Sequence, residues 1–412
     1  MVFTRSDWRL IILCLVAVAG TGVTRFAGGG TVLPFVIAAV ALALLASLVG
    51  RSVEALGDRL GAGATGVVQG ALGNLPELFV VLFALRDGLY ELASASIVGS
   101  ILANLLLVLG LSFVVGGLKN GTQRFVAESA RTMSLLLVLA VFALLIPALT
   151  AALHTPAAGH ERGLSIVVSI LLLALFVASL PAAIRRRTKT ETAAGPSETA
   201  GTRETAGAPE TAGVTASART GPGASGAVPA GAKAAEEHAQ KEHVQAENAQ
   251  EGGDQGHHGP AWPLQLALGM LAAAAIGAAF VSEWFVHALQ PAMTTLGISQ
   301  AFAGLVIVAI AGNAVENAVG IQLAARNQSD YALSVILQSP LQVALVVAPA
   351  LVLLSPLVGA SFTLVLPPLL IAALIIAVLV TVIVVLDGES NWLEGATLIV
   401  LYCVIAAAFW WG

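Results

Sequence analysis

Long apolar runs separated by short polar breaks extend over most of this chain. Eleven runs are long enough to cross a hydrocarbon core of about 30 Å, which takes about 20 helical residues. They cover residues 9–27, 31–50, 61–85, 91–117, 130–150, 163–184, 262–289, 297–325, 331–355, 362–386 and 392–411. Runs this continuous exclude the alternating pattern of a membrane β-barrel, and backbone groups in lipid must then bond within helices. The pattern predicts an all-α polytopic membrane protein with eleven transmembrane helices.

Composition agrees with this fold class. Hydrophobic residues make up 57% of the chain and charged residues only 10%, whereas a soluble domain carries about 25% charged residues. The two cysteines, Cys14 and Cys403, both lie in apolar runs, which argues against a disulfide framework. The first run has no convincing small-residue cleavage site, so we expect it to be a retained helix rather than a signal peptide.

Basic residues predict the orientation in the membrane. If the eleven runs cross in order, most Lys and Arg residues near their ends fall on one side, and only Arg25, Arg86 and Arg162 fall on the other. The residues on the basic side are Arg5, Arg9, Arg51, Arg59, Lys119, Arg124, Arg131, Arg185, Arg186, Arg187, Lys189 and Arg326. Cytoplasmic loops carry the excess of basic residues, so we expect the N-terminus inside and the C-terminus outside.

A polar segment, residues 185–260, interrupts the apolar pattern. Its repeated Glu-Thr-Ala-Gly phrases hold almost no large apolar side chains, which predicts a disordered cytoplasmic linker. Its His and Glu residues suggest either weak metal binding or only a solvated acidic linker, and a short helix over 233–250 is possible. The chain thus divides into an extra N-terminal helix (1–30), a five-helix repeat (31–184), the linker (185–260) and a second five-helix repeat (261–412).

One short motif occurs twice inside the apolar sequence, as Gly73–Glu77 and as Gly312–Glu316. A serine follows each glutamate by 23 positions, at Ser100 and Ser339. The two motifs lie in the third and eighth runs, so an odd number of crossings separates them. They must therefore have opposite orientations in the membrane, which predicts an inverted repeat of the kind found in secondary transporters.

The two glutamates indicate a cation or proton path. A carboxylate inside a membrane helix is costly, and neither of these two runs holds an Arg or Lys to pair with it. Helical spacing groups each motif Asn with its Glu, and groups Ser100 with Asn104 and Ser339 with Gln342. The expected ligand set is Glu77, Glu316, Asn74, Asn313, Ser100, Asn104, Ser339 and Gln342.

These residue types suit a hard divalent cation. Ca²⁺ takes 6–8 oxygen ligands, and the set contains no His or Cys that would favour zinc or copper. Each Asn, Ser or Gln alone can equally serve as a hydrogen-bonding contact between helices. Pro76 and Pro340, with glycines near them, are candidate helix breaks that would free backbone carbonyls as further ligands.

Two facing carboxylates also predict that cation transport is coupled to proton transport. When both are ionised and empty they repel each other strongly, and either protons or one divalent cation relieves that repulsion. If the helices rearrange only in a neutralised state, cation and proton must use the site in turn, which is obligate exchange. An intramembrane enzyme would need a nucleophile–base pair or a His-Glu-x-x-His phrase, and neither occurs in any run. We therefore expect a transporter and not an enzyme.

The chain resembles the calcium/proton antiporters of the cation/Ca²⁺ exchanger superfamily over nearly all of its membrane portion. The matching phrases are Gly73–Glu77, Ala95–Gly110, Gly312–Glu316 with Ser339 and Gln342, and Asp387–Gly395 before the last run. The resemblance implies a five-plus-five inverted antiporter in which Glu77 and Glu316 alternately hold Ca²⁺ and protons. It also implies that the second and seventh spans slide against the remaining helices. Asp387, Glu389 and Glu394 would lie at the cytoplasmic mouth or in a merely solvated hairpin.

The chain departs from that family at Leu75, Pro76 and Asn317, which lie beside the glutamates, and at Gln338 and Pro340, which flank Ser339. Pro76 resembles the sodium/calcium exchangers, which makes Na⁺/Ca²⁺ exchange the alternative; Asn74 and Asn313 favour protons. We expect Ca²⁺ and H⁺ as substrates, no cofactor, the lipid bilayer as partner and no nucleic acid. An oligomer is possible, but no feature of the sequence sets its size. The expected location is the inner membrane of a bacterial cell.

Overall fold

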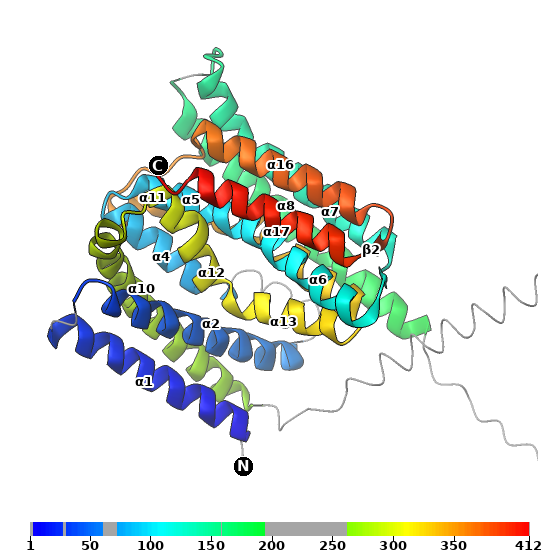
Figure 1. The fold of residues 1–412 in the computed structure, drawn as a ribbon, viewed down its shortest axis with the longest axis horizontal. Helices are drawn as coiled ribbons and strands as arrows, with labels where there is room; N and C mark the ends of the chain where they lie inside the picture. Colours follow the sequence, from blue (N-terminus) through cyan, green and yellow to red (C-terminus); the bar gives the residue numbers. More distant parts are fainter. Residues whose placement is uncertain (1–2, 28–29, 61–71, 158, 194–261, 412) are drawn as a thin grey trace, which may run out of the picture. The chain divides into compact units, whose positions relative to one another are not determined.

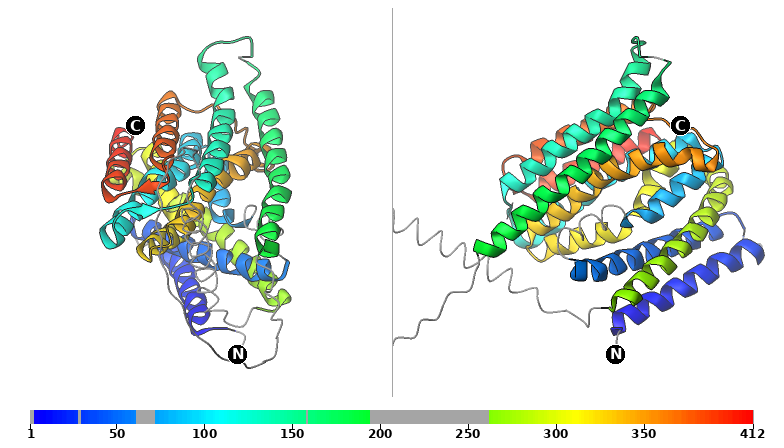
Figure 2. Two further views of the ribbon diagram at one scale, coloured as in Figure 1. Left: turned by 90° about the vertical axis from the view of Figure 1, so that its right-hand side faces the viewer. Right: turned by 180° about the vertical axis from the view of Figure 1, so that it is seen from behind.

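The structure is a computed structural model that describes residues 3–27, 30–60, 72–157, 159–193 and 262–411. Before the polar segment it contains α1 (Arg5–Ala27), α2 (Leu33–Leu60), α4 (Leu75–Arg86), α5 (Tyr90–Leu102), η1 (Ala103–Val108), α6 (Leu109–Asn120), α7 (Ala127–Ala152) and α8 (Glu161–Ala193). After it come α10 (Leu264–Leu296), α11 (Gln300–Phe302), η2 (Ala303–Val308), α12 (Ala309–Gly312), α13 (Ala314–Ala325), α14 (Ser329–Gln342), η3 (Val343–Val347), α15 (Ala348–Leu354), η4 (Ser355–Val358), α16 (Pro368–Val385) and α17 (Trp392–Ala408). Residues 1–188 and 261–412 form one compact unit, in which α1, α2 and α10 lie side by side (Figures 1 and 2).

The described helices confirm an all-helical, multi-pass membrane protein. Eight of them are long and apolar enough to cross a membrane, and a bent pair, Gln300–Gly312 with Asn317–Ala325, makes a ninth. The helix α17 is also apolar but has only 17 residues, and α4 has 12. The predicted count of eleven crossings is therefore not tested by length and composition alone.

A two-stranded ribbon is the part of the fold that the all-α prediction missed. Strand β1 (Gln123–Arg124) pairs antiparallel with β2 (Glu389–Ser390), and Arg124 forms an ion pair with Glu389 at 3.1 Å. Beside the ribbon, Asn391 and Glu394 form a reciprocal capping box at the start of α17. Glu394 therefore has a structural role in this hairpin: its carboxylate accepts the backbone N–H of Asn391 at 3.1 Å.

The end of α8 differs from the predicted start of the linker. The helix continues to Ala193, past residue 185, where the sequence predicted the linker to begin. Residues 194–261, with the expected helix over 233–250 and the linker His residues, lie outside the described residues.

The two halves of the chain repeat the same local backbone. Both α4 and α13 have 12 residues. Each follows an asparagine of nearly equal conformation, with φ −97° and ψ 19° at Asn74 and φ −107° and ψ 18° at Asn313. Each helix is then followed by a left-handed residue, Gly88 at φ 77° and Asn327 at φ 62°, which is the conformation that Gly and Asn tolerate best. The next helices, α5 and α14, both continue into a π-helix, η1 and η3.

Backbones of the two halves approach closely at glycines. A Cβ added to Gly99 on α5 would lie 2.4 Å from the Cα of Leu305 on η2. A Cβ added to Gly304 on η2 would lie 2.5 Å from the carbonyl oxygen of Leu92 on α5. Small residues thus let α5 and η2 pack backbone to backbone, as in other membrane helix pairs. This contact brings the two repeated motifs together.

Candidate cation site

Both repeated motifs stand at the start of a short helix. The helix α4 begins at Leu75 with Pro76 in its first turn, where proline is tolerated because the N–H it lacks has no helical partner there. In the second half, α12 ends at Gly312, and the chain bends by 63° between Gln300–Gly312 and Asn317–Ala325. Each motif glutamate therefore lies in the first turn of its helix, where the partial positive charge of the N-terminus favours a carboxylate.

The motif asparagines do not cap their own helices but bond across to the other half. Asn313 Nδ2 donates to Ser100 Oγ at 2.7 Å and also to the carbonyl oxygen of Ala309 at 3.0 Å. Asn74 Nδ2 donates to Gln342 Oε1 at 3.3 Å. The asparagine of each half thus contacts the helix that follows the motif in the opposite half. Two copies facing each other about a pseudo-two-fold axis would make this reciprocal pattern.

Ser339 extends the first of these connections. Its hydroxyl donates to Asn313 Oδ1 at 3.3 Å, so Ser100, Asn313 and Ser339 form one chain of polar groups. Ser100 and Asn313 are fully buried and Ser339 is 5% exposed. A connected polar network in such a setting holds its members in fixed positions.

Glu77 lies at the contact between the two motifs. Its side chain is 1% exposed, and a Cβ added to Gly312 would lie 3.6 Å from the Cβ of Glu77. The carboxylate of the first motif therefore packs against the glycine of the second. For the matching residue, Glu316, the structure describes the backbone in α13 but not the side chain.

Asn104 adds a buried oxygen near the same place. It lies in η1 and is fully buried, and its Nδ2 donates to the carbonyl oxygen of Ser100 at 2.9 Å. Its Oδ1 accepts no hydrogen bond from any residue that the structure describes. A buried amide oxygen without a donor is a costly arrangement unless a cation or water occupies the space beside it.

The described contacts join the sequence-predicted residues in three groups, and the backbone differs from the prediction at one place. Seven of the eight have described side chains, and these connect as Asn74 with Gln342, Asn313 with Ser100 and Ser339, Asn104 with the Ser100 backbone, and Glu77 with Gly312. The expected break at Pro340 is absent: α14 continues through Pro340 to Gln342 and then widens into η3. A π-helix changes the register of the backbone hydrogen bonds, so it loosens the helix at the site without breaking it.

The oxygen atoms that could bind a cation here belong to carboxylate, amide and hydroxyl groups. Among the described side chains, no three His, Cys, Asp or Glu residues gather as a metal cluster. The arrangement suits a hard cation held by mixed oxygen ligands rather than a soft metal.

Two residues near the site were missed by the sequence-based ligand set. Ser282 on α10 is fully buried, and its hydroxyl donates to the carbonyl oxygen of Pro76 at 3.4 Å. Asn317 has a buried Oδ1 that accepts no hydrogen bond from the described residues. A lone serine in an apolar helix gives no sequence signal of its own, whereas Asn317 stands directly beside Glu316.

Comparisons with known proteins agree with this geometry. The family model described as sodium/calcium exchanger protein matches residues 30–184 and 266–411. The chain is 34% identical to the "Ca(2+)/H(+) antiporter ChaA" of Bacillus subtilis (strain 168) over 91% of each protein. It is 29% identical to the "Ca(2+)/H(+) antiporter" of Synechocystis sp. over 97% of this chain and 95% of that protein. The solved structure of native YfkE matches with a TM-score of 0.71 and 30% identity, covering 97% of this chain and 99% of that one. The resemblance found in the motifs is confirmed, and the chain belongs to the sodium/calcium exchanger protein family.

Proposed function

We propose that this chain is a secondary antiporter that exchanges Ca²⁺ for H⁺ across a membrane by alternating access. The observation that carries the proposal is the buried Glu77, which packs on Gly312 of the second motif, together with the hydrogen bonds that the motif asparagines make between the halves. Similar proteins from Bacillus subtilis and Synechocystis carry the name Ca²⁺/H⁺ antiporter, which supports the same exchange here.

The membrane topology we propose is eleven crossings with two inverted five-helix repeats, residues 31–184 and 261–412, and an extra helix within 1–30. Contacts between loops support it. The ribbon β1–β2 joins the loops after the fourth and tenth crossings, and the N–H of Val126 donates to Asp330 Oδ1, after the eighth, at 2.6 Å. Thr295 donates to Thr31 at 3.0 Å, joining the loops after the seventh and first crossings. Even-numbered and odd-numbered loops thus gather separately, as alternating crossings require.

The distribution of basic residues supports a cytoplasmic N-terminus, and we propose the inner membrane of a bacterial cell as the location. In this orientation residues 185–260 connect the two repeats on the cytoplasmic side. Deletion of residues 190–255 is expected to leave the exchange intact, because no proposed ligand lies in that segment.

In the proposed mechanism Glu77 and Glu316 hold one Ca²⁺ or protons in turn. Asn104 Oδ1 and the amide and hydroxyl oxygens of the connected residues complete the ligand shell for the ion. Two ionised carboxylates without a cation would repel each other strongly in a buried site, so we expect the empty and unprotonated site to be excluded from the transport cycle. This exclusion forces exchange instead of leakage.

Sodium is the alternative counter-ion, because the matching family model is described as sodium/calcium exchanger protein. The experiment must therefore distinguish Na⁺ from H⁺. Purified protein in liposomes with an imposed pH gradient and no sodium distinguishes the two. We expect Ca²⁺ uptake that follows the pH gradient and is lost in Glu77→Gln and in Glu316→Gln. The matched control is Glu91→Gln, an exposed glutamate in the first turn of α5. Uptake that requires a sodium gradient would replace H⁺ by Na⁺ in the proposal.

A further inference from the structure

A second buried carboxylate lies outside the cation site, at the start of α1. Asp7 is 3% exposed. It accepts hydrogen bonds from the backbone N and the hydroxyl of Thr4, both at 2.8 Å. An aspartate in the first turn of a helix is favourable for the helix alone, so these contacts by themselves need no further explanation.

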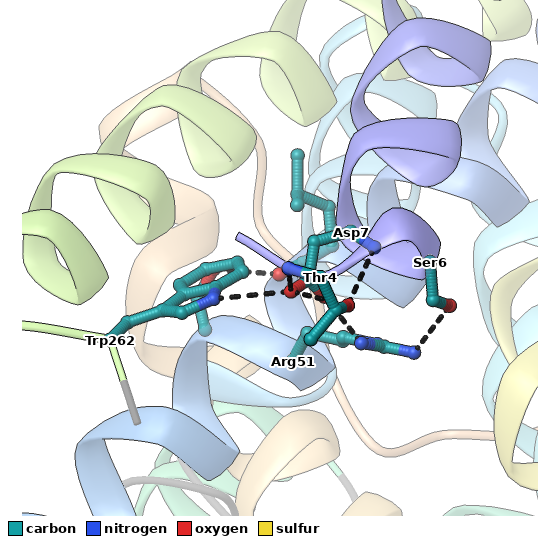
Figure 3. Close-up of polar contacts among 7 residues, drawn as sticks. Thr4, Ser6, Asp7, Arg51 and Trp262 are labelled. Atoms are coloured by element: carbon teal, nitrogen blue, oxygen red, sulfur yellow. Dashed lines mark hydrogen bonds and ion pairs between the residues drawn. The ribbon is translucent and has the colours of Figure 1, made fainter. Parts of the chain in front are cut away.

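The partners of Asp7 from other helices are less expected. Arg51 on α2 forms an ion pair with Asp7, and its Nη2 also donates to Ser6 at 3.0 Å. Trp262, just before α10, donates its indole N–H to Asp7 Oδ2 at 3.4 Å. Figure 3 shows these side chains converging on the Asp7 carboxylate. We call Thr4, Ser6, Asp7, Arg51 and Trp262 the Asp7 junction.

Beyond the Asp7 junction, α1 continues to pack against α2 and α10. A Cβ added to Gly20 would lie 3.5 Å from Ile37 of α2, and one added to Gly22 would lie 3.6 Å from the Trp284 ring of α10. Phe26 packs edge-to-face on the same Trp284 ring. The residues of α1 that are exposed and apolar, among them Leu15 and Val16, suit lipid. The helix thus has one face on α2 and α10 and the other toward the bilayer.

The ion pair between α10 and α4, the helix that carries Glu77, is more exposed to solvent than the Asp7 carboxylate. Arg86 of α4 pairs with Glu283 of α10 at 2.9 Å, but their side chains are 36% and 31% exposed. The bond from Ser282 to the Pro76 carbonyl has the same length, 3.4 Å, as the bond from Trp262 to Asp7, so hydrogen-bond length does not distinguish the two interfaces. A partly exposed ion pair exchanges readily with water, whereas a buried carboxylate that loses its charged partner is strongly destabilised. The ion pair between α1 and α2 is therefore harder to break than the one between α10 and α4, and α10 packs against α2.

We propose that Asp7 is a positioning residue for transport, which joins α1 to α2 and α10 so that these three helices move as one unit past the site. The inference rests on the proposed alternating access. The extra N-terminal helix is then part of the moving unit: if α2 and α10 shifted relative to each other, Asp7 would lose either Arg51 or Trp262.

Two crosslinks test this directly in liposomes, in a background with Cys14→Ala and Cys403→Ala. Gly20→Cys with Ile37→Cys is oxidised to join α1 to α2. Arg86→Cys with Glu283→Cys is joined by a reducible bifunctional thiol reagent that links α4 to α10. We expect the α1–α2 crosslink to leave Ca²⁺ uptake unchanged, and the α4–α10 crosslink to stop it until reduction restores it. Loss of uptake in the α1–α2 crosslink that reduction reverses would overturn the inference, while the reduced protein still reports on Ca²⁺/H⁺ exchange itself.

Substitutions at the Asp7 junction give a second readout. Arg51→Gln leaves Asp7 charged and buried without its cation, whereas Asp7→Asn keeps the shape and frees Arg51, which is 42% exposed, to turn to water. We expect Arg51→Gln to lower the maximal uptake rate more than Asp7→Asn does, and the double variant to recover to the Asp7→Asn level. The KM for Ca²⁺ stays unchanged in all three, because none touches the site. Additive losses in the double variant, or a raised KM, would contradict the positioning role.

Discussion

Asn313 Nδ2 donates a hydrogen bond of 2.7 Å to Ser100 Oγ, although the two residues stand 213 positions apart. Asn313 belongs to the second motif and Ser100 follows the first, so this bond connects the two halves of the chain at the candidate site. Its length and complete burial make it the most strongly held contact among the polar residues there.

Asn313→Ala tests that connection. The variant loses two donated hydrogen bonds and the one accepted from Ser339, so we expect a loss of about 1–2 kcal/mol in stability and a higher KM for Ca²⁺. The comparison variant is Asn74→Ala, which loses a single bond of 3.3 Å and is expected to change both quantities less. Unfolding in detergent and Ca²⁺ uptake measure the two effects. Equal KM values in Asn313→Ala and wild type would exclude Asn313 from the site.

The close approach of α5 and η2 predicts that Gly99 does not tolerate a larger side chain. In Gly99→Ala the new Cβ would meet backbone atoms of Leu305 at 2.4 Å, which only a separation of the two helices can relieve. We expect a lower unfolding temperature, equivalent to about 1–3 kcal/mol, and loss of uptake. Gly269→Ala on α10 is the matched control because a Cβ there has no neighbour within 4 Å. A Gly99→Ala protein as stable as Gly269→Ala would show that α5 and η2 are not in backbone contact.

Two variants in the hairpin before α17 test whether Glu394 only caps the helix or also takes part in transport. Glu394→Gln retains an acceptor for the N–H of Asn391, so we expect uptake and stability near the wild-type values. Asn391→Ala removes the oxygen that accepts the N–H groups of Leu393 and Glu394, which is expected to cost about 1 kcal/mol of stability. Thermal unfolding of both variants, with uptake measured in parallel, tests this. A specific loss of uptake in Glu394→Gln would instead support a carboxylate needed at the cytoplasmic mouth.

Much of this candidate site could be predicted from the sequence because it consists of polar residues that are costly to bury in lipid. Buried Glu77 and the amides near it occur at helical spacing in two copies, and few structural roles account for such residues in apolar runs. The reciprocal bonding of Asn74 and Asn313 could not be predicted, since it depends on how the helices pack in three dimensions. The π-helical segments were missed for the same reason: Asn104 lies in one, and nothing in its neighbours distinguishes a π-helix from an α-helix.

Other features were missed because single residues carry them. The bond of Ser282 to the Pro76 carbonyl and the ion pair of Asp7 with Arg51 join elements that are distant in sequence. The ribbon β1–β2 has only two residues in each strand, far below the length at which alternation becomes visible. Pro340 predicted a break, yet the helix passes through it, because the packing of neighbouring helices can offset one missing backbone bond.

In the proposed mechanism, Ca²⁺ and protons compete for one buried carboxylate site. Calorimetry of Ca²⁺ binding to purified protein at neutral pH, repeated in buffers with different heats of protonation, measures the protons released per ion bound. We predict that Ca²⁺ displaces protons from the wild-type protein and that Glu77→Gln releases fewer or does not bind, while Glu91→Gln matches the wild type. Tight Ca²⁺ binding whose heat does not depend on the buffer would contradict the claim.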